Sequence, residues 1–265
     1  MNHRAILLAL TVPWCLLVAG RAAAAERYEG QAFARQDPAA LLYRETHWLF
    51  EQGGVAQHVV LYRCPGGEAF ARKRLKASPD EPAPDFEFHD ARDGYREGVR
   101  TGGTGREVFV QTGAGASLQS RPLPSAPGAV IDAGFDAFVR TRWAALSAGQ
   151  SLTVPFLIPS RFEHWRFSIA EARDGVVDGQ PVRRLRMKVA AWYGFALPGI
   201  DLAYTPDGRR LVEFQGIGTV RDRQGRHLDV RIVFPPALRG ALVPDGEAAA
   251  ALAQPLVARC DGGVL

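Results

Sequence analysis

Alternating apolar and polar residues in the second half of the chain predict a series of antiparallel strands. In the clearest case, segment 164–170, three apolar side chains point to the same side: Trp165, Phe167 and Ile169. A repeat of two residues gives a strand one buried face and one face in water. The pattern recurs along residues 162–234 and predicts a five-stranded meander, with strands at 164–170, 184–191, 200–204, 212–215 and 227–234.

Turn residues separate these segments. Residues 206–208 (Pro-Asp-Gly) and 222–225 (Asp-Arg-Gln-Gly) predict tight hairpin turns, and two Asp-Gly pairs within 174–179 bracket a longer turn. The first half has a similar but less regular pattern, with strands expected at 28–35, 42–51, 55–64, 68–77, 95–99 and 106–112. Residues 78–84 and 113–128 are rich in Pro, Gly, Ser and Ala, which predicts loops.

One segment changes to a helical period. Asp132 is a suitable N-cap, Gly149 suits the C-terminal end, and apolar side chains follow at helical spacing: Phe135, Phe138, Val139, Trp143 and Leu146. This helix, about 132–148, is expected to pack its apolar face on another apolar surface. The concave side of the sheet is the only large apolar surface that the pattern predicts. The Ala-rich segment 246–257 favours a short second helix, limited by Pro255.

These elements predict a mainly β fold: a curved antiparallel sheet, or half-barrel, of about ten strands wrapped around one inserted helix. No internal repeat or linker divides the chain, so residues 26–265 are expected to form a single domain.

The first 25 residues have the three parts of a cleavable secretory signal. Arg4 gives a positive start, an apolar stretch runs from Ala5 to Ala19, and four alanines precede Glu26. The apolar stretch is shorter than the roughly 20 residues of a membrane span. The alternative is a permanent N-terminal anchor. We expect a bacterial protein of the periplasm, or one secreted beyond it, with no stable membrane span after cleavage.

Composition narrows the class of function. An apolar content of 47% suits a folded domain. The formal charge of +4 falls to about +2 once Arg4 and Arg21 leave with the signal, which is too small an excess to favour nucleic acid. The two remaining cysteines, Cys64 and Cys260, predict a disulfide in an exported chain; two free thiols are the alternative.

No sequence motif assigns a reaction or a cofactor. Serine-hydrolase, dinucleotide-binding and phosphate-loop motifs are absent, and the histidines are isolated in sequence, which gives no metal motif. His89 and Asp90 form one pair that suits acid–base chemistry, although such a cluster is more often a solvated turn.

A basic row is the other charged feature of the sequence. Arg184, Arg186 and Lys188 alternate along one strand and suit an anionic ligand. Alternatively, the row lies on the solvent-exposed face of a sheet and pairs across strands with acidic residues: Glu213, Asp201 or Asp229.

Aromatic residues are the stronger candidates for a binding site. They gather in the meander and on the helix: Trp143, Trp165, Trp192, Phe195, Tyr204 and Phe214. If sheet and helix close fully, these side chains are core. If the sheet wraps only partway, they line a groove for an acyl chain or an apolar peptide.

One hairpin carries a resemblance to known proteins. Segment 211–216 (Leu-Val-Glu-Phe-Gln-Gly), followed by Asp222 and Gly225, is similar to the terminal hairpin of uncharacterised exported families. Those families have Ser-Asn shortly after the Gly, where this chain has Gly218-Thr219.

A signal peptide, a curved antiparallel sheet and an inserted helix together resemble the bacterial lipoprotein-carrier superfamily (LolA/LolB-like half-barrels). The resemblance covers about residues 132–234. The resemblance implies a periplasmic half-barrel that shelters an apolar ligand. It transfers no catalytic residue, and the carriers' groove arginine has no matching position here.

Three hypotheses follow. The first is an exported protein that binds or carries a lipid or other apolar ligand between sheet and helix. The second is a cell-envelope structural or interaction module with a filled core. The third is a hydrolase with His89 and Asp90 at its site.

Overall fold

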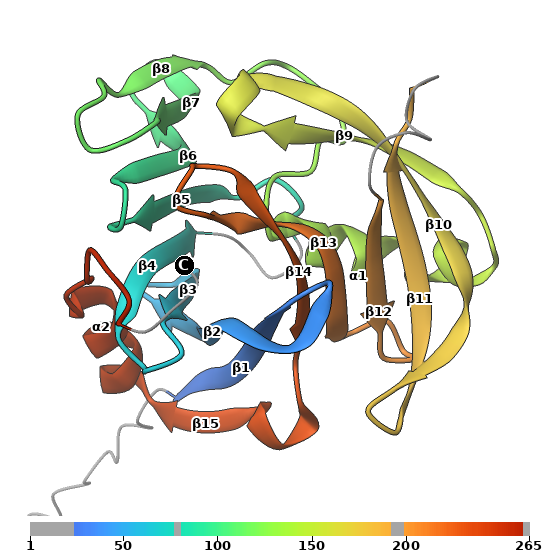
Figure 1. Cartoon of the computed structure of the whole chain (residues 1–265). Coiled ribbons are helices and arrows are strands. Elements are labelled where there is room, and N and C mark those ends of the chain that lie inside the picture. The colour runs from blue at the N-terminus through green and yellow to red at the C-terminus, as the bar shows by residue number, and fades with distance from the viewer. Residues whose placement is uncertain (1–23, 77–80, 192–198, 262–265) are drawn as a thin grey trace, which may run out of the picture.

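The computed structural model describes residues 24–76, 81–191 and 199–261, and within them the chain is mainly β (Figure 1). The first eight strands are β1 (Ala24–Ala34), β2 (Asp37–Gln52), β3 (Val55–Arg63), β4 (Ala69–Lys76), β5 (Asp85–Asp90), β6 (Tyr95–Gly102), β7 (Gly105–Gln111) and β8 (Gln119–Pro122). The others are β9 (Leu152–Ile158), β10 (Glu163–Val177), β11 (Gln180–Val189), β12 (Ile200–Tyr204), β13 (Leu211–Arg221), β14 (His227–Val233) and β15 (Ala241–Pro244). The helices are α1 (Gly134–Ser147) and α2 (Asp245–Ala253), with short 3-10 turns at Pro159–Arg161 and Pro236–Leu238.

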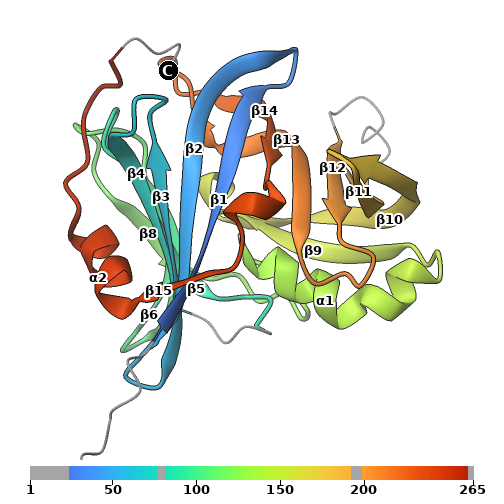
Figure 2. The same cartoon turned by 90° about the horizontal axis from the view of Figure 1, so that it is seen from below.

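One antiparallel sheet contains all of these strands. Its order is β8-β7-β6-β5-β4-β3-β2-β1-β14-β13-β12-β11-β10-β9, and β15 pairs with the start of β1. Two hairpin-linked runs, β1 to β8 and β9 to β14, are therefore joined side by side through β1 and β14. The sheet bends strongly and α1 lies against its second half (Figures 1 and 2). The curved antiparallel sheet with an inserted helix is confirmed.

The meander of five strands over 162–234 is confirmed, and the structure adds β9 before it. The tight turns are confirmed at Gly208 and Gly225, whose amides donate to Thr205 and Asp222. The expected long turn over 174–179 is wrong in extent. Asp174 and Gly175 are ladder residues of β10, and the turn is confined to Asp178 and Gly179, both with positive φ.

The first half holds more strands than the pattern predicted. All six expected strands are present, but β5 and β8 were missed. β8 occupies part of the segment expected to be a loop, and its four residues are all exposed, so no apolar alternation marks it. The expected ten strands are therefore too few.

The N-cap of α1 is one residue later than predicted. It is Ala133, which makes no side-chain capping hydrogen bond. The carboxylate of Asp132 accepts from the Ala133 amide and from Lys73. Gly149, with a φ of 79°, ends the helix by donating its amide to Leu146, as expected. The Ala-rich second helix is confirmed as α2.

Side chains fill two main cores. The first lies inside the curve of β1 to β7 and β14, around buried side chains such as Phe70, Phe88 and Ile131. The second lies between α1 and β9 to β12, around Val139, Leu146 and Ile169 among others. β9 contributes to both, because neighbouring residues of a strand point to opposite faces. Leu157 enters the first core and Val154 the second.

A third core lies on the outer face of β2 and β3, under α2. Trp48, Val59 and Leu61 pack there against Ala248 and Ala251 of the helix. In Figure 2, α2 and the tail after it run along the outside of the sheet. The tail is held by the disulfide Cys64–Cys260, with Cα atoms 5.5 Å apart, which confirms the predicted pairing.

The two ends of the sheet approach each other without pairing. The guanidinium of Arg121 on β8 lies 4.6 Å from the ring centroid of Phe162, beside β10. Between these ends runs segment 123–131, which we call the seam. Val130 of the seam bonds to β9, donating its amide to Pro155 and accepting one from Leu157. The sheet therefore stays open, and irregular backbone occupies the gap.

The proposed signal sequence lies mostly outside the described residues, and its cleavage stays a prediction. β1 begins at Ala24, and the fully buried Ala25 pairs with Val243 of β15. None of the described helices has the length and apolar character needed to cross a membrane.

Candidate functional site

The aromatic residues singled out in the sequence pack into the second core, as far as the structure describes them. Trp143, Trp165 and Phe214 are half-buried against it, and Tyr204 is 1% exposed within it. The Trp143 and Tyr204 rings lie 6.1 Å apart, and the Trp143 indole donates to Pro206. Trp192 and Phe195 fall outside the described residues. The interval between α1 and the sheet is thus occupied by side chains.

A recess lies at the seam instead. Its volume is about 390 Å³, and most of its lining is small or apolar: Pro82, Ala83, Leu123, Pro124, Ser125, Ala126, Gly128, Ala129 and Ile131, with Arg106 and His164. The small side chains of the seam leave this space unfilled. Ile131 and its neighbours also belong to the first core, so the floor of the recess is apolar.

Neither ionisable residue of the recess offers an unpaired charge near neutral pH. Arg106 on β7 forms an ion pair with Asp85 at 2.8 Å and donates to the carbonyl of Ala83. Burial lowers the pKa of His164, which favours its neutral form. The buried Nε2 atom of His164 has no hydrogen-bond partner. The chemistry of the recess suits an uncharged apolar group with at most one polar contact.

A second cluster lies on the concave side of β1, β2 and β3. Tyr28 and His47 are opposite each other in the ladder, and their rings stack with centroids 4.3 Å apart. His47 Nε2 lies 3.2 Å from Glu45 Oε2, and His47 Nδ1 lies 3.0 Å from His58 Nε2. The Tyr28 hydroxyl is 3.5 Å from the same His58 nitrogen. Cross-strand register brings these side chains together.

Burial controls the protonation of this cluster. Burial first, and then the charges of His47 and Lys73, holds the pKa of His58 well below its usual value. His58 is therefore neutral near pH 7. Burial likewise raises the pKa of Tyr28 well above its usual value, so its phenol keeps its proton.

The helix α1 adds a carboxyl next to this cluster. Tyr204 donates a hydrogen bond to Asp136 Oδ1 at 2.5 Å. Burial raises the pKa of Asp136, opposed by the Tyr204 hydrogen bond and by the charges of Arg140 and His47. Asp136 thus bonds to the second half of the sheet and is within electrostatic range of His47 in the first half.

Further into the first core lies a buried ion pair. Lys73 Nζ is 2.8 Å from each carboxylate oxygen of Asp132 and 3.4 Å from the Thr219 hydroxyl. Burial raises the pKa of the nearby Glu97 to about 7, and Tyr95 donates to its carboxylate at 2.7 Å. Burying these charges costs free energy unless they are paired. The strands that carry them must therefore keep the positions that allow the pairing.

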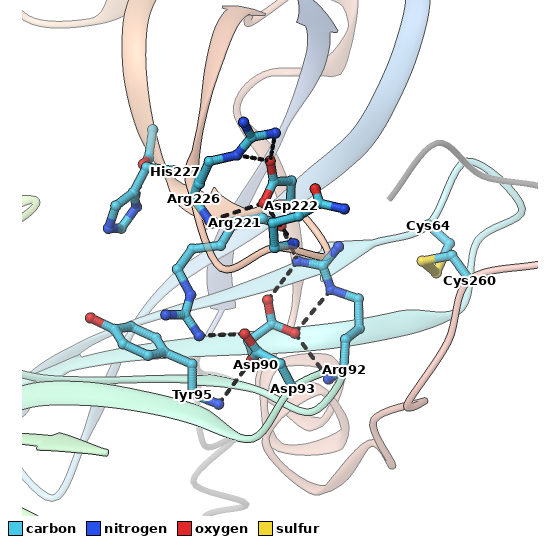
Figure 3. Close-up of polar contacts among 12 residues, drawn as sticks. Cys64, Asp90, Arg92, Asp93, Tyr95, Arg221, Asp222, Arg226, His227 and Cys260 are labelled. Atoms are coloured by element: carbon cyan, nitrogen blue, oxygen red, sulfur yellow. Dashed lines mark hydrogen bonds and ion pairs between the residues drawn. A yellow bond between two sulfur atoms is a disulfide. The ribbon is translucent and has the colours of Figure 1, made fainter. Parts of the chain in front are cut away.

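One end of the first core is closed by a clasp between two hairpins that are distant in the sheet order (Figure 3). Arg221 on β13 forms an ion pair with Asp93 of the β5–β6 turn, and its guanidinium lies 3.6 Å from the Tyr95 ring centroid. Arg92 binds Asp90 at 2.6 Å and donates to the carbonyl of Arg221. These contacts tie the β5–β6 turn directly to β13.

The two charged candidates from the sequence have structural partners. Asp90 is buried and bound to Arg92, while His89 is the next residue along β5, on the opposite face. They do not form an acid–base pair. Two of the three residues of the basic row are paired as the alternative predicted: Arg184 with Glu213 at 3.2 Å, and Arg186 with Asp201 at 2.5 Å.

Sequence reasoning did not single out the clustered polar residues His47, His58, Glu45, Lys73 and Glu97. One signal was available. Glu45 and His47 are two residues apart in a strand, so they point to the same side. Their partners come from other strands, and only the register reveals them.

Comparison with known proteins assigns no family. No protein-family model and no curated protein matches the chain. A beta-barrel-like protein of the domain of unknown function DUF1849 from Brucella abortus is similar in structure, with a TM-score of 0.46 and 7% identity over 80% of this chain and 96% of that one. A DUF1329 family protein from Desulfovibrio piger has a TM-score of 0.23 and 9% identity, over 81% and 83% of the two chains.

Proposed function

We propose that this protein binds a small apolar ligand, such as a single acyl chain, outside the cytoplasm and without catalysis. The recess at the seam is the proposed binding place. The observation that carries the proposal is its volume of about 390 Å³ with a lining that is mostly small and apolar. Ligand sites are concave and mainly apolar, with a few polar groups, and this recess has that composition.

The volume limits the ligand. At about 390 Å³, it is near the lower end of the ligand-pocket range of roughly 300 to 1,000 Å³. One short acyl chain or a small ring system fits this space, whereas a lipid with several acyl chains does not. Since Arg106 is already paired with Asp85, the recess favours a neutral ligand over an anionic one.

The disulfide supports the proposed location. Disulfides persist in oxidising compartments such as the bacterial periplasm, and Cys64–Cys260 is one. Periplasmic or secreted placement is therefore part of the proposal.

Two measurements test the binding. Protein purified from its native host is extracted with organic solvent, and purified protein is titrated with the neutral apolar fluorophore N-phenyl-1-naphthylamine. We expect a small apolar molecule in the extract and saturable binding of the probe. An empty extract together with no probe binding would refute the proposal.

A matched pair of variants locates the site. Ala126→Trp fills the recess, and we expect it to reduce the affinity for N-phenyl-1-naphthylamine at least tenfold. Ala144→Trp places the same bulk on the exposed side of α1 and should leave the affinity unchanged. Equal binding by both variants would show that the recess is not the site.

The second candidate function is an envelope structural or interaction module without a ligand. The filled interval between α1 and β9 to β12 favours it, because that interval is the groove position expected from the sequence. An empty extract and absent probe binding support this candidate over the first.

A further inference from the structure

The facing nitrogens of His47 and His58 have the arrangement of two ligands around one ion. His47 Nδ1 and His58 Nε2 are 3.0 Å apart. With metal–nitrogen bonds of about 2.05 Å, this separation gives a nitrogen–metal–nitrogen angle of about 94°. An angle near 90° matches tetragonal coordination, which Cu²⁺ and Ni²⁺ prefer, better than the tetrahedral coordination of Zn²⁺.

The outer partner of His47 also matches a metal site. A metal-ligating histidine usually donates its other ring N–H to a carboxylate, which orients the ring and raises its basicity. His47 Nε2 lies 3.2 Å from Glu45 Oε2, and both side chains are buried. His47 Nε2 then donates to Glu45, and His47 Nδ1 accepts the hydrogen bond from His58 Nε2, whose proton a bound metal ion would displace.

His58 is prepared for the same role. Its Nε2 atom faces His47 Nδ1 and becomes a ligand once its proton is released. Its ring is half-buried, as is that of Tyr28, whose hydroxyl lies 3.5 Å away. Partial exposure leaves a path for an ion and for water ligands.

We propose that His47 and His58 form a two-imidazole site for a divalent transition-metal ion, with Cu²⁺ bound most tightly and Glu45 as a positioning residue. In the described residues no group of three or more His, Cys, Asp and Glu side chains is placed to hold an ion. The site therefore supplies two protein nitrogens, with the Tyr28 hydroxyl as the nearest further oxygen. Water or an added ligand completes the coordination. This site is separate from the recess and does not depend on it.

The test uses the full chain without an affinity tag. His3 with the free amino group, and the thiol of Cys15, are other copper donors in the sequence, so every protein carries His3→Gln and Cys15→Ala. Each protein is titrated with Cu²⁺, Ni²⁺ and Zn²⁺ by calorimetry, and the Cu²⁺ form is examined by electron paramagnetic resonance. We expect one Cu²⁺ per chain, nitrogen hyperfine structure, and affinities in the order Cu²⁺ > Ni²⁺, with Zn²⁺ below Cu²⁺.

Variants separate ligands from the positioning residue. His47→Gln and His58→Gln should each abolish stoichiometric uptake and the nitrogen hyperfine pattern. Glu45→Gln should keep the stoichiometry but weaken the affinity about 10- to 100-fold, the usual effect of losing an outer-shell partner. His89→Gln, on the outer face of β5, is the matched control and should change nothing.

Two outcomes would overturn the proposal. One is the absence of 1:1 uptake by the parent protein, which would leave the pair as a hydrogen bond between imidazoles. The other is unchanged uptake in both His47→Gln and His58→Gln. Circular dichroism of each variant shows whether it folds, and the Glu45→Gln result stands even if one histidine variant does not.

Discussion

The ammonium group of Lys73 on β4 contacts both carboxylate oxygens of Asp132, each at 2.8 Å, and Asp132 stands immediately before α1. The pair joins residues 59 positions apart, and both side chains are nearly buried. It therefore ties the start of the inserted helix to the inside of the first half of the sheet. Asp132 also has a φ of 46°, a conformation that Asp tolerates better than most residues.

Removing one partner of this pair is expected to be costly. Asp132→Asn leaves the buried ammonium group without its counter-charge and should lower the free energy of unfolding by about 3 kcal/mol. The double variant Lys73→Met/Asp132→Asn should recover most of that loss, since no charge is left buried. Urea unfolding measures each value. The control Asp174→Asn breaks an exposed pair with Arg183 and should change stability by less than about 0.5 kcal/mol.

Stability should depend on pH through Glu97. Burial raises its pKa from 4.5 to about 7 in the folded protein. The folded state therefore holds a proton that the unfolded state releases between these values. This contribution is fully present below pH 4.5 and is lost as pH rises through 7, and it amounts to about 3 kcal/mol.

The variant Glu97→Gln isolates that contribution. Relative to it, the natural protein should lose about 3 kcal/mol of unfolding free energy between pH 4.5 and pH 8. The Gln side chain still accepts the hydrogen bond from Tyr95, so packing is kept. Urea unfolding at both pH values tests this, and a difference that does not change with pH would contradict it.

The disulfide should stabilise the tail and α2. Cys64 and Cys260 are 196 positions apart, so the bond closes a very long loop. Its removal by Cys64→Ala/Cys260→Ala should cost about 2 to 5 kcal/mol. Thermal unfolding gives the total effect. Hydrogen exchange should rise first in residues 245–257, because α2 covers Trp48 and Leu61 from outside; uniform exchange across the sheet would argue otherwise.

Gly208 should not tolerate a side chain. A Cβ atom there would lie 2.0 Å from the Trp143 indole, and the φ of 71° strains any larger residue. Gly208→Ala should therefore destabilise the protein by more than about 2 kcal/mol. Gly53→Ala is the control, since Gly53 has a similar φ of 60° but nothing within 4 Å of the added Cβ. Thermal unfolding should separate the two variants clearly.

Local patterns predicted most of the elements for a physical reason. In a strand with one solvent-exposed face, apolar residues recur every two positions, as from Trp165 to Ile169. In a helix that covers a sheet they recur with the helical period, as from Phe135 to Leu146. Both are visible without knowing what lies opposite. β8 was missed because it is exposed on both faces, and Asp132 was taken for a cap because the charge that holds it comes from β4.

By itself, the sequence determined a mainly β chain with one amphipathic helix, its principal turns, and the two cysteines that are able to pair. Tertiary structure alone decided that the aromatic candidates among the described residues pack into a core, that a recess opens at the seam, and that His47 meets His58. Those outcomes depend on strand register and on how far the sheet curls. Both are settled by contacts between residues far apart in the chain, such as Arg221 with Asp93, which no local period records.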